Sequence, residues 1–230
     1  LTGIGGSETM AMNLARLLAL KGHAVRLYGH CTPSQEGIFD GVQYLDASRY
    51  KNIKCDVMIS SRKPSAIDDE WGLEAKARVL WVHDVHCGEE LNFAREMRYD
   101  RILALSSWHK SFLSRCYPTI NPEKIIRTRN GIDLGRFEGV EARDQHRAIY
   151  TSSPDRGLAS LLEMWPAIRK EVPDATLAVA YGFHNWLTFA KMAGDEQGQR
   201  LAAHLEHLAK STEGVTYLGR INQKELAREF

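Results

Sequence analysis

The sequence lacks three features that would place the protein in a simple class: a long apolar run, paired cysteines and a block of like charge. A membrane span needs about 20 consecutive apolar residues, so we predict no transmembrane segment. The 30 Lys and Arg residues nearly balance the 29 Asp and Glu, leave a net charge of +1 and are scattered along the chain. Because nucleic-acid partners require a basic surface, we predict no nucleic-acid partner.

The four cysteines, Cys31, Cys55, Cys87 and Cys116, form no C-x-x-C pair. A zinc knuckle or a dithiol redox centre is therefore not indicated. Together with the absence of a secretory signal, this cysteine usage predicts a reducing, cytoplasmic compartment.

The sequence does contain a regular alternation of short apolar segments with amphipathic ones. The apolar segments, which we predict to be parallel strands, are 24–28, 56–59, 79–82, 102–105, 124–128, 148–151, 175–181 and 215–218. The amphipathic segments, which we predict to be helices, are 7–21, 66–77, 89–97, 108–116, 158–168, 195–210 and one that starts after Asn222. We expect Pro166 to kink or shorten the helix that contains it.

This alternation continues on both sides of a polar linker at 135–146. It predicts two doubly wound, Rossmann-like α/β domains, 1–140 and 141–230. The first domain opens on a helix, and the second stops about two turns into one. We therefore expect the first strand of domain 1 and the end of domain 2 to be missing.

The opening stretch GIGGSE runs from a glycine-rich turn into a helix. Glu8 occupies the third glycine position of a dinucleotide fingerprint and no acid follows the next strand, so a dinucleotide is not indicated. The absence of G-K-[ST] excludes a P-loop. A phosphate or another anion at the helix N-terminus is one hypothesis, and a tight turn that binds no ligand is the other.

Polar residues follow the predicted strands, where open parallel sheets bind their ligands. In the first domain they are His83 and Asp84 after 79–82, and Arg127 and Asn130 after 124–128. We expect His83 to contact a substrate, with a satisfied half-buried histidine as the alternative. The adjoining H-x-x-H-C pattern matches no usual zinc signature, so we predict no metal.

In the second domain, Ser152, Ser153 and Arg156 follow 148–151, and Gly219 and Arg220 follow 215–218. Arg156 lies beside a predicted helix N-terminus, where a cation is disfavoured unless an anion comes between. This arrangement favours a phosphate site. Pairing of Arg156 with a neighbouring acid, or its exposure to solvent, is the alternative.

Seven stretches occur in one order: GIGGSE, KGHAVRLYG, VLWVHD, ALSSWHKSFL, KIIRTRNGID, SSPDRGLASLLEMWP and TYLGRINQKEL. The set resembles the retaining glycosyltransferases of the GT-B fold, in the large family often called family 4. The resemblance implies sugar transfer, with retention, from a nucleotide-sugar to a glycan, lipid-linked or small-molecule acceptor, as in polysaccharide biosynthesis. It implies no metal and no cofactor besides the donor. It also implies a cytoplasmic location, which extends to peripheral association with the inner face of the membrane.

The resemblance also implies roles for residues of the first domain. Gly5, Gly6 and Ser7 match a glycine loop near the donor phosphates and the acceptor. His83 matches a histidine that contacts the transferred sugar, and Asp84 is its neighbour.

In the second domain, Arg156 matches a residue that binds the donor diphosphate. Ser152 and Ser153 stand where the family has a second cation, and we expect them to donate hydrogen bonds to phosphate oxygens beside Arg156. Gly219 and Arg220 match the loop that holds the nucleobase.

Asn130 matches the family's N-G-[VI]-D turn at the base of the ligand cleft, where we also expect Arg127. The sequence departs from the family in two ways: one of two second-domain cations is missing, and so is the E-x7-E segment that the family would have after the TYLGRINQKEL stretch. We therefore expect the chain to be a fragment that is inactive alone. A non-catalytic nucleotide-sugar-binding protein and a GT-B-like epimerase remain the alternatives.

Overall fold

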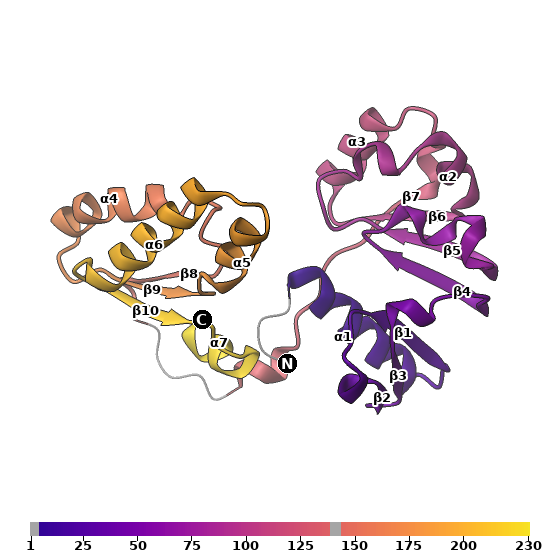
Figure 1. Cartoon of the computed structure of the whole chain (residues 1–230), viewed down its shortest axis with the longest axis horizontal. Coiled ribbons are helices and arrows are strands. Elements are labelled where there is room, and N and C mark those ends of the chain that lie inside the picture. Colours follow the sequence, from indigo (N-terminus) through magenta and orange to yellow (C-terminus); the bar gives the residue numbers. More distant parts are fainter. Residues whose placement is uncertain (1–4, 139–143) are drawn as a thin grey trace. The chain divides into compact units, whose positions relative to one another are not determined.

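The computed structural model of the chain describes residues 5–138 and 144–230. These residues form two compact units, an N-terminal unit from Gly5 to Ile132 and a C-terminal unit that begins at Asp133 (Figure 1). Each unit is a mixed α/β structure built on parallel strands, which confirms the predicted fold class at that level. The predicted domain boundary at 140/141 lies outside the described residues.

The N-terminal unit contains α-helices, strands and short 3-10 turns. Its helices are α1 (Gly6–Leu20), α2 (Phe93–Arg98) and α3 (Ser107–Cys116). Its strands are β1 (Val25–Gly29), β2 (Gly37–Phe39), β3 (Val42–Asp46), β4 (Lys54–Ser61), β5 (Glu74–Trp81), β6 (Arg101–Ala104) and β7 (Ile125–Arg127).

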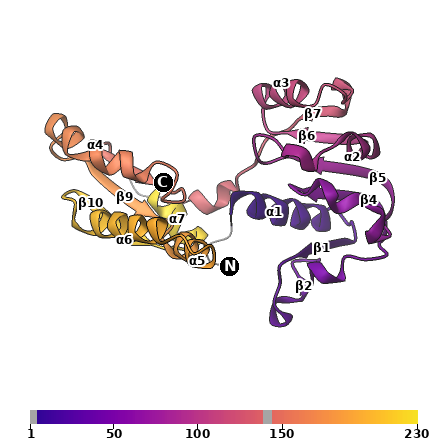
Figure 2. The same cartoon turned by 45° about the horizontal axis from the view of Figure 1, so that its top comes forward.

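The strands of this unit form two sheets. One has the order β4-β5-β6-β7 and is parallel throughout. The other has the order β1-β3-β2, with β1 parallel and β2 antiparallel to β3. Figure 2 shows α3 beside β6 and β7 at one end of the larger sheet, and α3 contacts both strands.

The predicted helix at 66–77 is wrong. Two 3-10 turns, Pro64–Ile67 and Asp69–Trp71, occupy its first part, and β5 begins at Glu74. The segment has good helix formers, but β5 is hydrogen-bonded to β4 and β6 on both sides, and this tertiary pairing outweighs local propensity.

The β2–β3 hairpin was not predicted, although its turn carries a recognisable signal. Asp40 and Gly41 have φ values of +52° and +76°. Two successive residues with positive φ form the tight turn that Asp-Gly favours between antiparallel strands.

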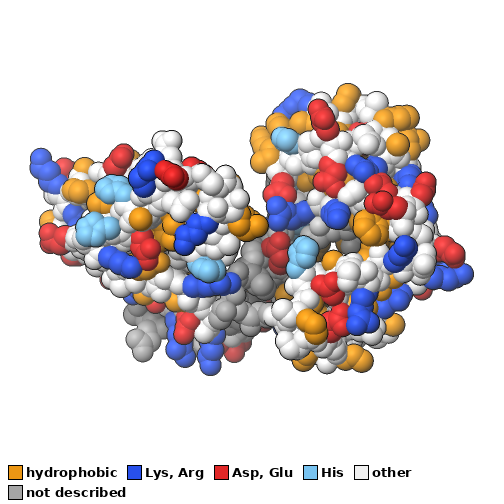
Figure 3. All heavy atoms as spheres, in the orientation of Figure 1, with side chains coloured by type: hydrophobic (Ala, Val, Ile, Leu, Met, Phe, Trp, Pro, Cys, Tyr) orange, Lys and Arg blue, Asp and Glu red, His pale blue; other side chains and the backbone are white. Residues whose placement is uncertain are grey.

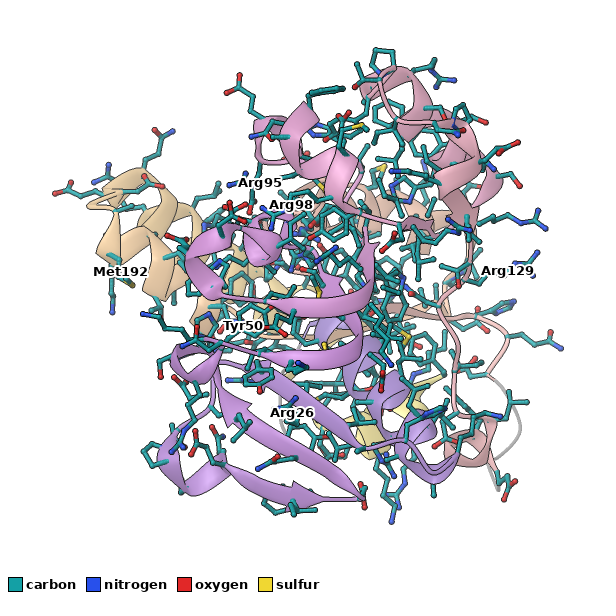
Figure 4. All side chains as sticks on the ribbon, turned by 90° about the vertical axis from the view of Figure 1, so that its right-hand side faces the viewer. Arg26, Tyr50, Arg95, Arg98, Arg129 and Met192 are labelled. Carbon is teal, nitrogen blue, oxygen red and sulfur yellow. The ribbon has the colours of Figure 1, made fainter. Side chains whose placement is uncertain are left out.

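The edge strands β1 and β4 are linked by a side chain. Within the described residues, β1 pairs only with β3, and β4 pairs only with β5. Arg26 on β1 donates from Nη2 to the main-chain oxygen of Lys54 on β4 at 2.9 Å (Figure 4). Val57 and Ile59 of β4 are 55% and 38% exposed, so this edge also leaves apolar surface uncovered.

The C-terminal unit contains a parallel sheet of order β10-β9-β8. Its elements are β8 (Arg147–Tyr150), α4 (Leu158–Glu171), β9 (Thr176–Ala180), α5 (His184–Met192), α6 (Glu196–Ser211), β10 (Val215–Gly219) and α7 (Gln223–Glu229). The core joins Trp165 of α4, Leu177 of β9 and Leu205 of α6.

Two expectations from the sequence concern helices of this unit. The α4 helix continues through Pro166 to Glu171, so the proline does not end it. At α7, Asn222 accepts from the N–H of Glu225, and the Glu225 carboxylate accepts from the N–H of Asn222. This capping box starts the helix after Asn222, as predicted. Across the part of the chain that the structure describes, no helix has the length and apolar character needed to cross a membrane.

Candidate functional site

A cavity of about 440 Å³ opens in the N-terminal unit where β4 and β5 end. This is the edge at which an open parallel sheet binds ligands. The cavity is lined by Glu8, Ser61, Arg62, Lys63, Asp84, His86, Cys87 and Glu90. The predicted residue Asp84 is therefore in the lining, whereas the two basic residues that follow β4 were not predicted.

Arg62 organises the charged groups of this cavity. Its Nε donates to Asp84 Oδ2 at 2.7 Å, and its Nη2 donates to Asp84 Oδ1 at 3.3 Å. Its Nη1 lies 3.3 Å from Ser7 Oγ and 3.4 Å from Glu8 Oε1. One guanidinium thus connects the first turn of α1 with the loops that follow β4 and β5.

The backbone at Arg62 has a left-handed conformation, with φ at +68°. A non-glycine side chain in this region costs roughly 1–3 kcal/mol, and such residues cluster at functional sites. The strained turn directs the guanidinium onto Asp84 and Glu8. Strand-end position alone could have identified Arg62, since it directly follows β4.

His83 lies beside the cavity rather than in its lining. Its ring centroid is 4.4 Å from that of Trp81, and its Nε2 is buried with no hydrogen-bond partner among the described residues. Burial first, and the Arg62 guanidinium second, lower the pKa of His83. The imidazole is consequently neutral at neutral pH.

His109 on α3 was not predicted as part of this region. Only 5% of it is exposed, and the N–H of Leu105 donates to its Nδ1 at 3.1 Å. The ring proton of neutral His109 must then be on Nε2, which is near the backbone of Asp84 and Val85 but forms no hydrogen bond of good geometry there. Burial lowers the pKa of His109 as well.

The predicted glycine loop is at the cavity, but its environment is not that of a simple phosphate loop. The N–H groups of Gly6, Ser7 and Glu8 have no acceptor within the described residues. A Cβ at Gly5 would collide with the Glu8 carboxylate, whereas a Cβ at Gly6 would meet open space. The free amides therefore face a site that already contains a negative charge.

Two other chemistries receive no support at this cavity. Burial raises the pKa of the Cys87 thiol to about 12, so it is not a thiolate nucleophile. Among residues 5–138 and 144–230, no group of three or more His, Cys, Asp and Glu is arranged to hold a metal ion.

The predicted cleft residues Arg127 and Asn130 do not line this cavity. Arg127, at the end of β7, donates from Nη1 to Ser107 Oγ on α3 at 2.9 Å and belongs to a separate groove. Asn130 is exposed in the segment that follows β7.

In the C-terminal unit, Arg156 lies next to the start of α4. Gly157, with φ at +105°, turns the chain into the helix and offers no side-chain cap. The N–H groups of Ala159 and Ser160 lack an acceptor in the described part of the chain, where Arg156 also forms no ion pair. A cation beside free helix amides is an arrangement suited to an anion.

The serines near Arg156 have different surroundings. Ser153 Oγ donates to the carboxylate of Asp155, and its carbonyl accepts from Tyr150 Oη at 2.7 Å. Asp155 is therefore engaged by Ser153 rather than by Arg156. Ser152 is half-buried.

Gly219 and Arg220 come together with the end of β9. The N–H of Tyr181 donates to the Gly219 carbonyl at 2.8 Å, and a Cβ at Gly182 would contact the backbone nitrogen of Arg220. Tyr181 has a φ of +125°, a second strained non-glycine residue at a strand end. Most of the predicted second-domain residues thus follow strands at one edge of the sheet.

The surface agrees with the balanced composition. Figure 3 shows Lys and Arg side chains interspersed with Asp and Glu on the displayed faces of both units. No family model matches the chain, and no curated protein matches it. The fold and sites define a class only: an α/β protein of two units, each with polar and charged residues where its parallel strands end.

Proposed function

We propose that the protein is a metal-independent, retaining glycosyltransferase of the GT-B type, which uses a nucleotide-sugar donor. The single observation that carries the proposal is the start of α4, which follows a parallel strand. There Arg156 adjoins helix amides, and neither the cation nor the amides have a partner within residues 5–138 and 144–230. A diphosphate is the ligand that best complements this combination.

The donor would bind the C-terminal unit through its phosphates. Arg156 and the amides of Ala159 and Ser160 would neutralise the charge that develops on the leaving diphosphate. The turn at Gly219 and Arg220 follows β10, which is separated from β8 by β9 in the same sheet. There it would contact the nucleobase. This assignment needs no metal, since the positive charge comes from protein groups.

The acceptor would bind the cavity of the N-terminal unit. Glu8, Asp84 and Glu90 supply carboxylates, while Arg62 and Lys63 supply donors. Carboxylates disfavour a phosphate but accept hydrogen bonds from sugar hydroxyls. We therefore assign this cavity to a polyhydroxyl acceptor and not to the donor phosphates.

Binding of nucleotide diphosphates tests the donor assignment without requiring an acceptor. The chain would be titrated calorimetrically with UDP, GDP and ADP, and we expect saturable binding of at least one. Arg156→Gln should weaken that binding by roughly 1.5–3 kcal/mol, the value of a charge-assisted hydrogen bond, or about 10- to 100-fold.

Arg200→Gln is the matched control. Arg200 is in the same unit, its side chain is 73% exposed, and its replacement removes the same charge. Absence of binding for all three nucleotides, or equal losses in the two variants, would contradict the proposal.

A further inference from the structure

The segment from Arg101 to Ile132 concentrates positive charge in a chain that is otherwise balanced. It contains six Lys and Arg residues and one acid, Glu123. The segment includes β6, α3 and β7, which pack together at one end of the N-terminal unit (Figure 2). Its charge is not used by the acceptor cavity, which none of its residues lines.

A groove of about 550 Å³ runs between α3 and β7. It is lined by Ser107, Lys110, Ser111, Ser114 and Arg127. The four α3 residues share one face of the helix because they recur at intervals of three or four. Arg127 closes the groove from the carboxyl end of β7, an edge strand.

Every side chain in this lining is a hydrogen-bond donor, and none is a carboxylate. Arg127 Nη1 donates to Ser107 Oγ at 2.9 Å, which fixes the guanidinium at one end of the groove. Ser114 Oγ donates to the Lys110 carbonyl at 3.0 Å, whereas the Lys110 ammonium has no partner among the described residues.

Some cations elsewhere in the unit have carboxylate partners. Lys54 and Lys76, for example, pair with Glu74 and Asp56 at 3.1 Å and 2.7 Å. Lys110 and Arg127 form no ion pair within residues 5–138 and 144–230. Like charges around one groove repel each other unless an anion is bound between them.

We propose that the α3–β7 groove binds a phosphate group, separately from both sites of the proposed transferase. Phosphate oxygens would accept from the Arg127 guanidinium, from the Lys110 ammonium and from the serine hydroxyls, all of them suitable partners. A metal ion does not fit, because hard cations require oxygen ligands that the two cations would oppose. The phosphate group can belong to a small soluble molecule or to a lipid headgroup.

The test uses the full chain in an Arg156→Gln background, so that the proposed donor site does not contribute. Inorganic pyrophosphate is titrated at low ionic strength and followed calorimetrically. We expect saturable binding that falls about tenfold in Lys110→Gln and again in Arg127→Gln. Arg115→Gln is the matched control, because Arg115 is on the same helix but lies over the Phe112 ring, 5.7 Å from its centroid.

A second arm identifies the source of the phosphate. Sedimentation with phosphatidylcholine vesicles, with and without phosphatidic acid, should depend on Lys110 and Arg127 if the ligand is a headgroup. Binding of pyrophosphate without vesicle association assigns the site to soluble phosphate compounds.

The proposal is overturned if neither probe binds saturably, or if Arg115→Gln weakens binding as much as Lys110→Gln does. The second result would indicate a net-charge effect without a site. Because Arg156 is replaced in every sample and the proposed donor site is therefore weakened equally in all of them, neither result bears on the proposed transferase function.

Discussion

The left-handed backbone at Arg62 leads to a prediction that separates conformational strain from ion pairing. The two variants are Arg62→Ala and Arg62→Gly. Both remove the contacts to Asp84 and Glu8, but only glycine adopts a φ of +68° without a steric penalty. The difference between them therefore measures strain at this residue.

The structure sets the expected magnitudes. The side chains of Arg62, Asp84 and Glu8 are 45%, 54% and 51% exposed, so solvent screens these ion pairs. Exposed pairs contribute about 0.2–1 kcal/mol each, and we expect Arg62→Ala to lower the free energy of unfolding by about 1 kcal/mol. Glycine recovers roughly 1–2 kcal/mol of left-handed strain but loses about 0.5–1 kcal/mol through the entropy of the unfolded chain. Arg62→Gly should thus be about as stable as the original protein.

Hydrogen exchange at the amides of β5 provides the assay, since it reports the stability of the N-terminal unit by itself. Asp84→Asn is the comparison variant, because it removes the main ion pair and leaves the backbone at residue 62 unchanged. Equal losses of stability in Arg62→Ala and Arg62→Gly would refute the argument for strain and would show that the ion pairs alone matter.

Two further predictions concern buried and partly buried groups of the N-terminal unit. The pKa values of His83 and His109 are lowered in the folded state. As the pH falls through the ordinary histidine pKa of about 6.5, the unfolded chain therefore binds more protons than the folded one. The free energy of unfolding should consequently decline between about pH 7 and pH 5. His109→Gln should flatten this decline in pH-dependent urea unfolding, and an unchanged slope would contradict it. Arg95 on α2 (Figure 4) binds Asp68 through two nitrogens, at 2.6 Å and 2.8 Å. Arg95→Lys keeps the charge but loses this two-point geometry, and we expect it to lower the free energy of unfolding in urea by roughly 1.5 kcal/mol. No loss would show that the two-point contact is dispensable.

The sequence was most informative where the signal is local. The amphipathic stripe at 7–21 predicted α1, which is Gly6–Leu20, to within one residue at each end. Asp195 caps α6 through its side chain, as its position before the apolar stripe indicates. Such features depend on residues a few positions apart, so they are visible without the fold.

The candidate site was less accessible because it depends on pairing between distant segments. The strand-end rule located Asp84, and the glycine pattern located the first turn of α1. Arg62 was missed because the strand before it was predicted to end at residue 59, whereas β4 extends to Ser61, and because its contacts are 22 and 54 residues away. The helix α5 and strand β3 were missed because each is short and only tertiary packing distinguishes it from a loop. The sequence analysis gave no role to His109, because its environment depends on the backbone N–H of Leu105, which donates to its ring.

The opening glycines illustrate how charge decides between two ligands that a backbone alone would accept. The amides at the start of α1, which have no acceptor within the described residues, by themselves favour an anion. Glu8, however, lies three residues after Gly5, and its carboxylate occupies the space over that glycine and pairs with Arg62. A phosphate entering this site would have to displace or repel that carboxylate, whereas at Arg156 it would meet a cation and helix N–H groups that have no acceptor within the described residues. This difference in charge is the reason for the proposed assignment of hydroxyl groups to α1 and of phosphate to α4.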